Sequence, residues 1–239
     1  MKILVIPDVH LKPWMFDRAS ELMKTGAADR ALCLMDLPDD WHQQYNIDLY
    51  VQTFARAVEF QKEFPDTLWC WGNHDVCYPW DERETGWSFL APYAVNKGIE
   101  DLKAAIPKAE QLAFIHRIDR VLFTHGGLTD RFVRRYFLTG QYDDTELVVN
   151  AINAMGHQEL WDDSSPLWHR PQYSGEKMYK EGELLQVVGH TPVERIRREG
   201  SVISCDVFST FRSRKPIGTE EFPLIDTETG AFRGLKSRT

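Results

Sequence analysis

Five short apolar segments of this chain each end in residues of the kinds that bind metal ions. Their continuous apolar character is typical of strands that are covered on both faces of a parallel sheet. In an open α/β sheet, ligands bind beyond the carboxyl ends of the strands. We therefore expect a single site if these strands are neighbours. The residues that follow the segments are Asp8-Val9-His10, Asp36, Gly72-Asn73-His74-Asp75, His125-Gly126-Gly127 and Gly189-His190-Thr191.

The residue types at these positions suit a site for two divalent cations. Asp8 and His10 are two residues apart, so on an extended backbone their side chains would point to the same side. A carboxylate such as Asp36 can bridge two cations through its two oxygens, and Asn73 supplies a neutral carbonyl oxygen. Imidazoles favour Mn, Fe, Zn, Co or Ni over Ca or Mg. Two cations about 3.5–4 Å apart can bind a phosphoryl group and activate water.

Predicted strands alternate with predicted helices along the chain, which indicates an α/β fold. Gly26 is placed to end the first helix, and Asn46 can cap the start of the second. The strand-rich part after residue 184 suggests a second sheet or an antiparallel edge. The predicted elements are strands at 2–6, 31–35, 67–71, 121–124, 184–188 and 201–207, helices at 14–25, 46–64, 99–112, 130–138 and 145–160, irregular segments at 80–98 and 161–182, and a hairpin at 222–232.

Composition narrows the class of protein. Of the 239 residues, 43% are hydrophobic, which is enough for a sizeable core, and we expect one domain over residues 1–239. The net charge of −8 argues against binding of long nucleic acid. No apolar stretch approaches the ~20 residues that cross a membrane, and the apolar N-terminal run is too short for a signal peptide. The four cysteines form no C-x-x-C pair, and those at 33, 70 and 205 lie in apolar runs that suggest buried free thiols. Without a signal peptide or a membrane span, a reducing cytoplasm is the expected location.

Taken in order, the five blocks resemble the calcineurin-like metallophosphoesterase superfamily. That family carries D-x-H, G-D-x-x-D, G-N-H-D/E, a single His and G-H-x, and the matching blocks here extend from Asp8 to Thr191. His125-Gly126-Gly127 resembles the phosphoprotein phosphatase and diadenosine tetraphosphatase branch, and Pro192 stands where the nuclease and phosphodiesterase branches carry His. The resemblance implies an α/β fold, an αββα sandwich of two mixed β-sheets flanked by helices.

The resemblance also implies a dinuclear metal centre, with Mn expected first and Fe, Zn, Ni or Co as alternatives. A metal-bound hydroxide would attack phosphorus, and Asp36 would be shared by both ions. Asp8, His10 and Asp36 would hold the first ion, and Asp36, Asn73, His125 and His190 would hold the second.

Further residues match parts of the family's catalytic apparatus. His74 matches the general acid that protonates the leaving oxygen, and Asp39 matches the partner that keeps this imidazole charged and oriented. Arg170 is a candidate for phosphate binding because its planar guanidinium suits phosphate oxygens; the alternative is stacking on a neighbouring tryptophan. Asp206 is expected to hold a ligand imidazole.

Two positions depart from the family pattern. Met35 replaces the glycine before Asp36, and a side chain there would crowd the strand end. Asp40 stands where many protein phosphatases carry a phosphate-binding arginine, which weakens the case for a phosphoprotein substrate. Four aromatic residues after the ligand blocks either line a substrate pocket or pack the loops: Trp41, Tyr78, Trp80 and Trp87.

The leading hypothesis is a phosphomonoesterase of the protein-phosphatase kind, acting on a phosphorylated small molecule or phosphoprotein. A second hypothesis keeps the metal centre but changes the substrate to a phosphodiester or a dinucleoside polyphosphate. A third, of a different class, is a metal-binding interaction scaffold with little catalysis. The complete set of ligand residues argues against the third hypothesis, and neither long nucleic acid nor membrane is an expected partner.

Overall fold

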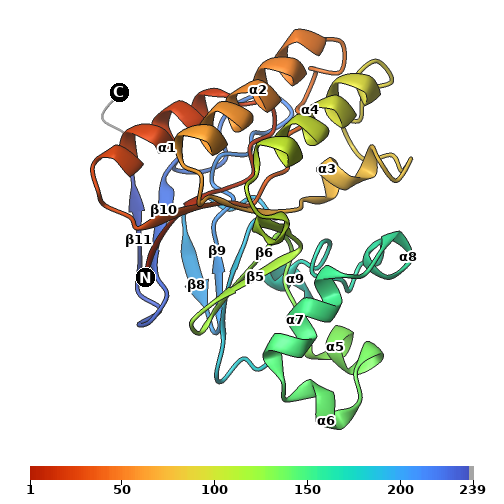
Figure 1. Ribbon diagram of the computed structural model, residues 1–239, viewed down its shortest axis with the longest axis vertical. Helices are drawn as coiled ribbons and strands as arrows, with labels where there is room; N and C mark the ends of the chain where they lie inside the picture. The colour runs from red at the N-terminus through yellow and green to blue at the C-terminus, as the bar shows by residue number, and fades with distance from the viewer. Residues whose placement is uncertain (237–239) are drawn as a thin grey trace.

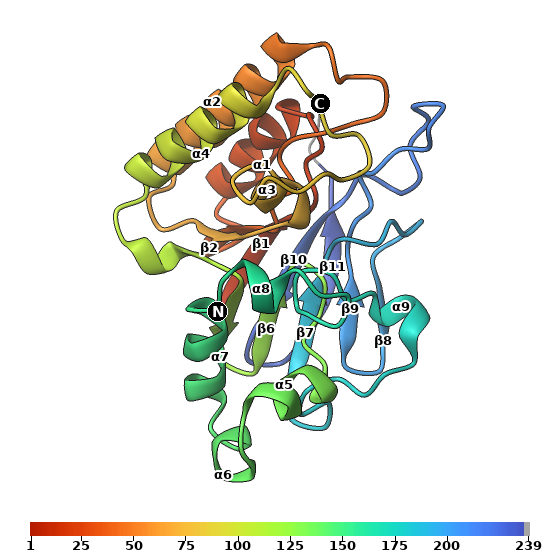
Figure 2. The same ribbon diagram turned by 90° about the vertical axis from the view of Figure 1, so that its right-hand side faces the viewer.

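Two β-sheets lie face to face between two layers of helices in the computed structural model, which describes residues 1–236 (Figures 1 and 2). The strand order is β11-β10-β1-β2-β3-β4 in the first sheet and β5-β6-β7-β9-β8 in the second. The predicted αββα fold of two mixed sheets is therefore confirmed. The strands are β1 (Lys2–Ile6), β2 (Arg30–Cys33), β3 (Leu68–Cys70), β4 (Leu112–Ala113), β5 (Ile115–Ile118), β6 (Val121–Thr124), β7 (Leu185–Val188), β8 (Arg197–Glu199), β9 (Val202–Ser204), β10 (Phe222–Asp226) and β11 (Phe232–Leu235).

Helices α1, α2 and α4 cover the first sheet, and the helices from α5 onward lie on the side of the second sheet (Figure 1). Among residues 1–236, no helix is both long and apolar enough to cross a membrane. The predicted domain of residues 1–239 includes 237–239, which lie outside the described residues. The helices are α1 (Trp14–Lys24), α2 (Ile47–Glu63), α3 (Asn73–Cys77), α4 (Pro92–Ala105), a 3-10 turn (Ala109–Gln111), α5 (Asp130–Tyr136), α6 (Thr139–Tyr142), α7 (Thr145–Asn153), α8 (His157–Leu160) and α9 (Pro171–Ser174).

Strand β1 shows why its sequence is apolar at consecutive positions. Ile3 and Val5 belong to the core between the two sheets, whereas Leu4 and Ile6 belong to the core under helices α1 and α2. A strand that is covered on both faces has no solvent side for polar residues. Each of these buried side chains stabilises the fold by about 1.5–3 kcal/mol relative to exposure.

The central strands of each sheet run parallel, which gathers their carboxyl ends at one edge. Strands β1, β2 and β3 pair in parallel in the first sheet, and β6, β7 and β9 do so in the second. Antiparallel strands flank both sets, with β10 and β11 on the first sheet and β5 and β8 on the second. The predicted antiparallel edge after residue 184 is thus present.

Several predicted boundaries were wrong. Helix α4 starts at Pro92, seven positions before the prediction of residue 99, because proline is accommodated in the first turn of a helix. The helix predicted over 145–160 is two helices, α7 and α8, with Gly156 between them. Strands β4, β5 and β8 were missed. β4 has only two residues, and β8 is exposed and charged and gains its conformation from pairing with β9.

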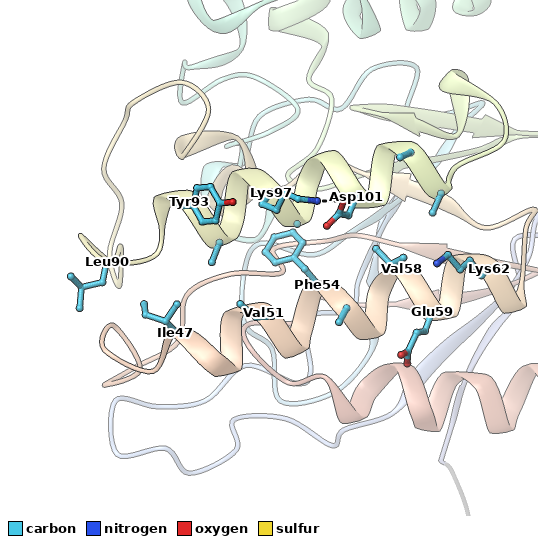
Figure 3. Close-up of a pocket in the computed structure, with 15 residues that line it drawn as sticks. Ile47, Val51, Phe54, Val58, Glu59, Lys62, Leu90, Tyr93, Lys97 and Asp101 are labelled. Atoms are coloured by element: carbon cyan, nitrogen blue, oxygen red, sulfur yellow. Dashed lines mark hydrogen bonds and ion pairs between the residues drawn. The ribbon is translucent and has the colours of Figure 1, made fainter.

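Helices α2 and α4 pack closely because Gly98 of α4 leaves room for a partner side chain. A Cβ atom at Gly98 would lie 2.3 Å from Phe54 Cγ of α2. Their outer seam forms a cavity of about 800 Å³ between residues such as Val51 and Tyr93 (Figure 3). None of the predicted site residues lines it, so the chemistry lies elsewhere.

Candidate metal centre

The predicted ligands come together at the carboxyl edges of the two sheets. Asp8 and Asp36 follow strands β1 and β2, and Asn73 begins α3 just after β3. His125 and His190 follow β6 and β7 of the other sheet. Two groups of side chains each have potential ligand atoms within 4.8 Å of one another: Asp8, His10 and Asp36, and Asp36, His125 and His190.

The burial of these groups fits a bound cation. Among the described residues, Asp8 Oδ1 and His190 Nε2 are buried atoms without a hydrogen-bond partner. Burial raises the pKa of Asp8 well above its usual value, and the neighbouring carboxylates of Asp206 and Asp36 raise it further. Unpaired buried polar atoms are costly. Divalent cations held by the two groups would satisfy these atoms and would favour the charged carboxylate of Asp8.

Backbone carbonyls fix the orientation of two of the imidazoles. His125 Nδ1 lies 3.0 Å from the Leu34 carbonyl oxygen, and His10 Nδ1 lies 2.9 Å from the Asp39 carbonyl oxygen. Because a carbonyl only accepts, each Nδ1 carries the proton and Nε2 is left for the site. His125 Nε2 is 3.0 Å from Asn73 Oδ1. An imidazole that binds a metal ion through Nε2 is typically oriented in this way, by a hydrogen bond from Nδ1 to a carbonyl oxygen.

The carboxylate of Asp36 interacts electrostatically with several of the imidazoles in the site. Burial alone would raise its pKa, but the imidazoles of His125 and His74 outweigh that effect and hold the pKa well below its usual range. Burial lowers the pKa of His125, but Asp36 and Asp8 together raise it to about 9. Burial and the charge of His125 hold the pKa of His190 well below its usual value.

Two glycines leave room for the carboxylates. A Cβ atom at Gly189 would lie 1.9 Å from Asp8 Oδ1, and one at Gly72 would lie 2.1 Å from Asp36 Oδ1. Real Cβ atoms do not approach oxygen so closely, so any side chain at these positions would displace a carboxylate. Glycine at these two positions therefore permits the close approach of backbone to carboxylate.

The backbone at the strand ends is bent where the sequence suggested extension. His10, Asp36 and His190 have positive φ angles of 43°, 45° and 60°. The prediction that Asp8 and His10 share a side through an extended strand was therefore wrong, although both side chains reach the same site. The Val9 amide donates to the Met35 carbonyl oxygen and the His10 amide to the Asp36 carbonyl oxygen, and these two hydrogen bonds hold the bent segment. Strained backbone of this kind gathers at functional sites.

Asp75 is a residue whose role the sequence did not reveal. Its carboxylate accepts hydrogen bonds from the amides of Asp36 (2.7 Å), Leu37 (3.0 Å) and Gly72 (3.1 Å). It thereby joins the loop after β2 to the loop after β3. Burial and the charge of Asp36 raise the pKa of Asp75 to about 7. The only signal was its place beside Asn73 and His74 in a ligand block.

His74 and Asp39 meet as the family pattern predicts. His74 Nδ1 lies 3.0 Å from Asp39 Oδ2. The hydroxyls of Tyr50 and Tyr78 donate to Asp39 Oδ1 over 2.9 and 2.7 Å. Burial lowers the pKa of His74, but Asp36 and the hydrogen bond to Asp39 raise it to about 9. Tyr50 could not be assigned this role from the sequence, because it lies on the buried face of helix α2 and its position there predicts a core residue.

A cavity of about 340 Å³ opens onto His10, His74 and His190. Arg170 and Trp41 also line it. The Arg170 guanidinium donates to the His190 carbonyl oxygen (2.8 Å) and to Thr191 Oγ1 (3.2 Å). Of the four aromatic residues with an open role, Trp41 lines this cavity, Tyr78 binds Asp39, and Trp80 and Trp87 pack against other rings.

Three sequence expectations change in detail. Met35 is buried in the core under the helices, so its side chain does not narrow the site. The charge of Asp40 is paired with Lys12, whose Nζ lies 3.7 Å from Asp40 Oδ2. Asp206 was expected to hold a ligand imidazole; its carboxylate instead accepts hydrogen bonds from the amide (3.2 Å) and hydroxyl (2.8 Å) of Ser209.

Comparison with known proteins agrees with this geometry. The family model described as calcineurin-like phosphoesterase matches residues 1–214. A cold-active protein-tyrosine phosphatase from a psychrophilic Shewanella species has a similar fold, with a TM-score of 0.53, 17% identity and coverage of 98% of this chain and 80% of that chain. A second structure of a cold-active protein tyrosine phosphatase aligns with a TM-score of 0.54 and 17% identity, over 98% of this chain and 78% of that one.

No curated protein matches the sequence. The structural likeness at such low identity shows the fold alone, whereas the family model covers most of the chain. Members of that family hydrolyse phosphoric esters with bound divalent metal ions, and the two groups of buried ligand residues are in keeping with this. The chain belongs to the calcineurin-like phosphoesterase family and is a metal-dependent phosphoric ester hydrolase.

Proposed function

We propose that this hydrolase acts on phosphomonoesters and holds two metal ions, with manganese as the first candidate and iron, zinc, nickel or cobalt as alternatives. Two such ions supply positive charge for the phosphoryl oxygens and a nucleophile from water at neutral pH. Asp36 is the shared ligand. The first ion is assigned to Asp8, His10 and Asp36, and the second to Asp36, Asn73, His125 and His190.

The observation that carries the proposal is the His74–Asp39 pair inside the cavity that the ligands line. Because Asp39 accepts from Nδ1, the transferable proton of His74 is on Nε2. Asp36 and the hydrogen bond to Asp39 raise the pKa of His74, which favours the protonated state that an acid needs. Asp39 is in turn oriented by the Tyr50 and Tyr78 hydroxyls. We assign to His74 the protonation of the leaving alcohol oxygen.

Arg170 is assigned to the substrate phosphate. One guanidinium nitrogen is held by the His190 carbonyl and Thr191 Oγ1, which fixes the plane of the group at the cavity wall. A guanidinium has further donors in the same plane, and these suit phosphate oxygens. Arg170→Lys should therefore raise KM for a phosphomonoester more than it lowers kcat.

The test of the acid is a leaving-group series. His74→Asn should lower kcat for an alkyl phosphate by about 100-fold or more, because an alkoxide needs the proton. For p-nitrophenyl phosphate, whose leaving group is stable without a proton, the loss should be much smaller. Metal content of the variant, measured by plasma mass spectrometry, must equal that of the unaltered protein. Equal losses on both substrates would remove His74 from the role of acid.

The substrate class is tested by parallel assays. The metal-stripped protein is supplied in turn with Mn, Fe, Zn, Ni or Co and assayed on a phosphomonoester, a phosphodiester and a dinucleoside polyphosphate. We expect the phosphomonoester to have the highest kcat/KM. A phosphodiester or dinucleoside polyphosphate that is hydrolysed faster would replace the proposal with the corresponding activity. Metal binding without hydrolysis of any of the three would favour a scaffold role.

A further inference from the structure

Residues 210–216, here named the basic arm, connect β9 to β10 beside the cavity. The bridge between Thr210 and Pro216 and the hydrogen bond from the Phe211 amide to the Lys215 carbonyl (2.9 Å) close the segment on itself. In Figure 2 this part of the chain projects, in blue, from the edge of the molecule. The arm is thus a short internally bonded hairpin and has a defined shape.

The basic arm is fastened to the segment that carries Asp39. Trp41 Nε1 donates to the Thr210 carbonyl oxygen (3.0 Å), and His42 Nε2 donates to the Arg212 carbonyl oxygen (3.0 Å). The Thr210 hydroxyl reaches Asp40 Oδ1 at 3.3 Å. These contacts hold the arm against the cavity wall, since Trp41 and Arg212 both line the cavity that opens onto the metal ligands.

The charge of the basic arm is opposite to that of the whole protein. Arg212, Arg214 and Lys215 are exposed, and residues 207–219 contain no acidic side chain. The next acid along the chain, Glu220, is paired with Arg18 at 3.9 Å. No ion pair within residues 1–236 involves the three cations of the arm. Arg212 lines the cavity and lies over the Trp41 ring, while Arg214 and Lys215 lie farther along the same hairpin. In a chain of net charge −8, this group of three cations attracts anions to that side of the cavity.

Each of the two acids that line the cavity has a basic partner: Asp39 is bound to His74, and Asp40 lies beside Lys12. Lys12 lies 3.7 Å from Asp40 and neutralises its charge. Phe211 is 55% exposed on the arm and offers an apolar surface beside the cations. The arm therefore presents positive charge and a ring to any part of a substrate that extends out of the cavity.

We infer that the basic arm binds a second anionic group of the substrate, at a distance from the phosphate that is hydrolysed. This rests on the proposed phosphomonoesterase activity. The chemistry of the arm recognises a further phosphate or carboxylate on the same molecule. That group belongs either to a nucleotide with a second phosphate or to a phosphopeptide with acidic neighbours.

The test compares two matched substrate pairs. One pair is a nucleoside 5′-monophosphate and the nucleoside 3′,5′-bisphosphate. The other is a phosphotyrosine peptide flanked by glutamate and the same peptide flanked by glutamine. For each pair, the kcat/KM of the more anionic substrate is divided by that of the less anionic one. Replacing Arg212, Arg214 and Lys215 by alanine should lower this ratio about tenfold for one pair, equivalent to ~1.4 kcal/mol of lost interaction.

The control removes the same number of positive charges at positions that do not line the cavity. Arg117 lies in β5, Arg120 in the turn between β5 and β6, and Arg198 in β8. Their replacement by alanine should leave both ratios unchanged. In the unaltered protein, the ratio should also fall as KCl rises from 50 to 500 mM, because exposed charges are screened. Because this salt series uses the unaltered protein, its result does not depend on whether the variants fold correctly.

The outcomes separate the two proposals. If the unaltered protein hydrolyses none of the four substrates, the phosphomonoesterase proposal fails. If it hydrolyses them but both ratios are insensitive to the arm variant and to salt, only the inference about the arm fails. A ratio that falls for the nucleotide pair identifies a nucleotide as the source of the second anion. A ratio that falls for the peptide pair identifies an acidic phosphopeptide.

Discussion

At the scale of single residues, Asp36 is the ligand that the two candidate metal groups share. Asp36→Asn keeps the shape of the side chain but removes the charge that two cations would both use. We expect both metal ions to be lost and kcat to fall by about 100-fold or more. His10→Gln, which affects one group only, should lose a single ion. Metal content by plasma mass spectrometry and turnover of p-nitrophenyl phosphate measure both effects.

Met35 occupies a backbone conformation that explains the glycine of the family pattern. Its φ is 56°, and a non-glycine residue there costs about 1–2 kcal/mol. The side chain is nevertheless buried, and removing a buried methionine side chain costs about 2–5 kcal/mol. Met35→Gly should therefore lower the free energy of unfolding by roughly 1–3 kcal/mol, measured by urea denaturation. An increase in stability would mean that the strain outweighs the packing.

Asp75 tests whether three backbone hydrogen bonds hold the site loops. Asp75→Ala leaves three buried amide donors without an acceptor, so it should lower the free energy of unfolding by roughly 3 kcal/mol or more. Asp75→Asn keeps one acceptor oxygen and should lose less. Urea denaturation of both variants gives the comparison. Equal losses in the two variants would show that charge, not hydrogen bonding, is the contribution of Asp75.

At the scale of elements, His116 links strand β5 of one sheet to β3 of the other. Its Nε2 lies 3.0 Å from the Trp69 carbonyl oxygen. Burial lowers its pKa from 6.5 to about 4, so the folded protein holds it neutral while the unfolded chain binds a proton below pH 6.5. Its contribution to stability is complete above pH 6.5 and falls by roughly 3 kcal/mol as the pH drops toward 4.

The pH dependence of His116 can be separated from that of the metal site by substitution. His116→Gln retains a donor for the Trp69 carbonyl but does not titrate. The unaltered protein should lose stability between pH 6.5 and 4.5 more steeply than the variant, in urea denaturation at several pH values with a chelator present. Parallel curves for the two proteins would exclude His116 as the cause.

At the scale of the whole molecule, metal binding should stabilise the fold because the ligands come from both sheets. A ligand that binds only the folded state adds about 2.7 kcal/mol at 100 times its Kd. Addition of Mn to the chelator-treated protein should therefore raise the free energy of unfolding by a few kcal/mol. Asp36→Asn should show a much smaller rise at the same concentration. A similar rise in that variant would place the stabilising metal at a different site.

The sequence by itself determined the central buried strands and the identity of the residues that gather at the site. Continuous apolar runs such as residues 2–6 require cover on both faces, and polar residues directly after them can only lie at a sheet edge. The family pattern supplied the pairing of His74 with Asp39, which the structure shows at 3.0 Å. These inferences succeed because they depend on local pattern and on residue chemistry.

Only the tertiary structure decided how those residues are held and what surrounds them. The backbone is left-handed at His10 and Asp36. Hydrogen bonds from Tyr50 to Asp39, and from two site loops to Asp75, join segments that are far apart in the chain. The sequence alone does not predict such contacts, because each partner has the character of an ordinary core or loop residue. The candidate ligands can thus be identified from the residues that follow the strands. Their geometry is set by the packing of the two sheets face to face.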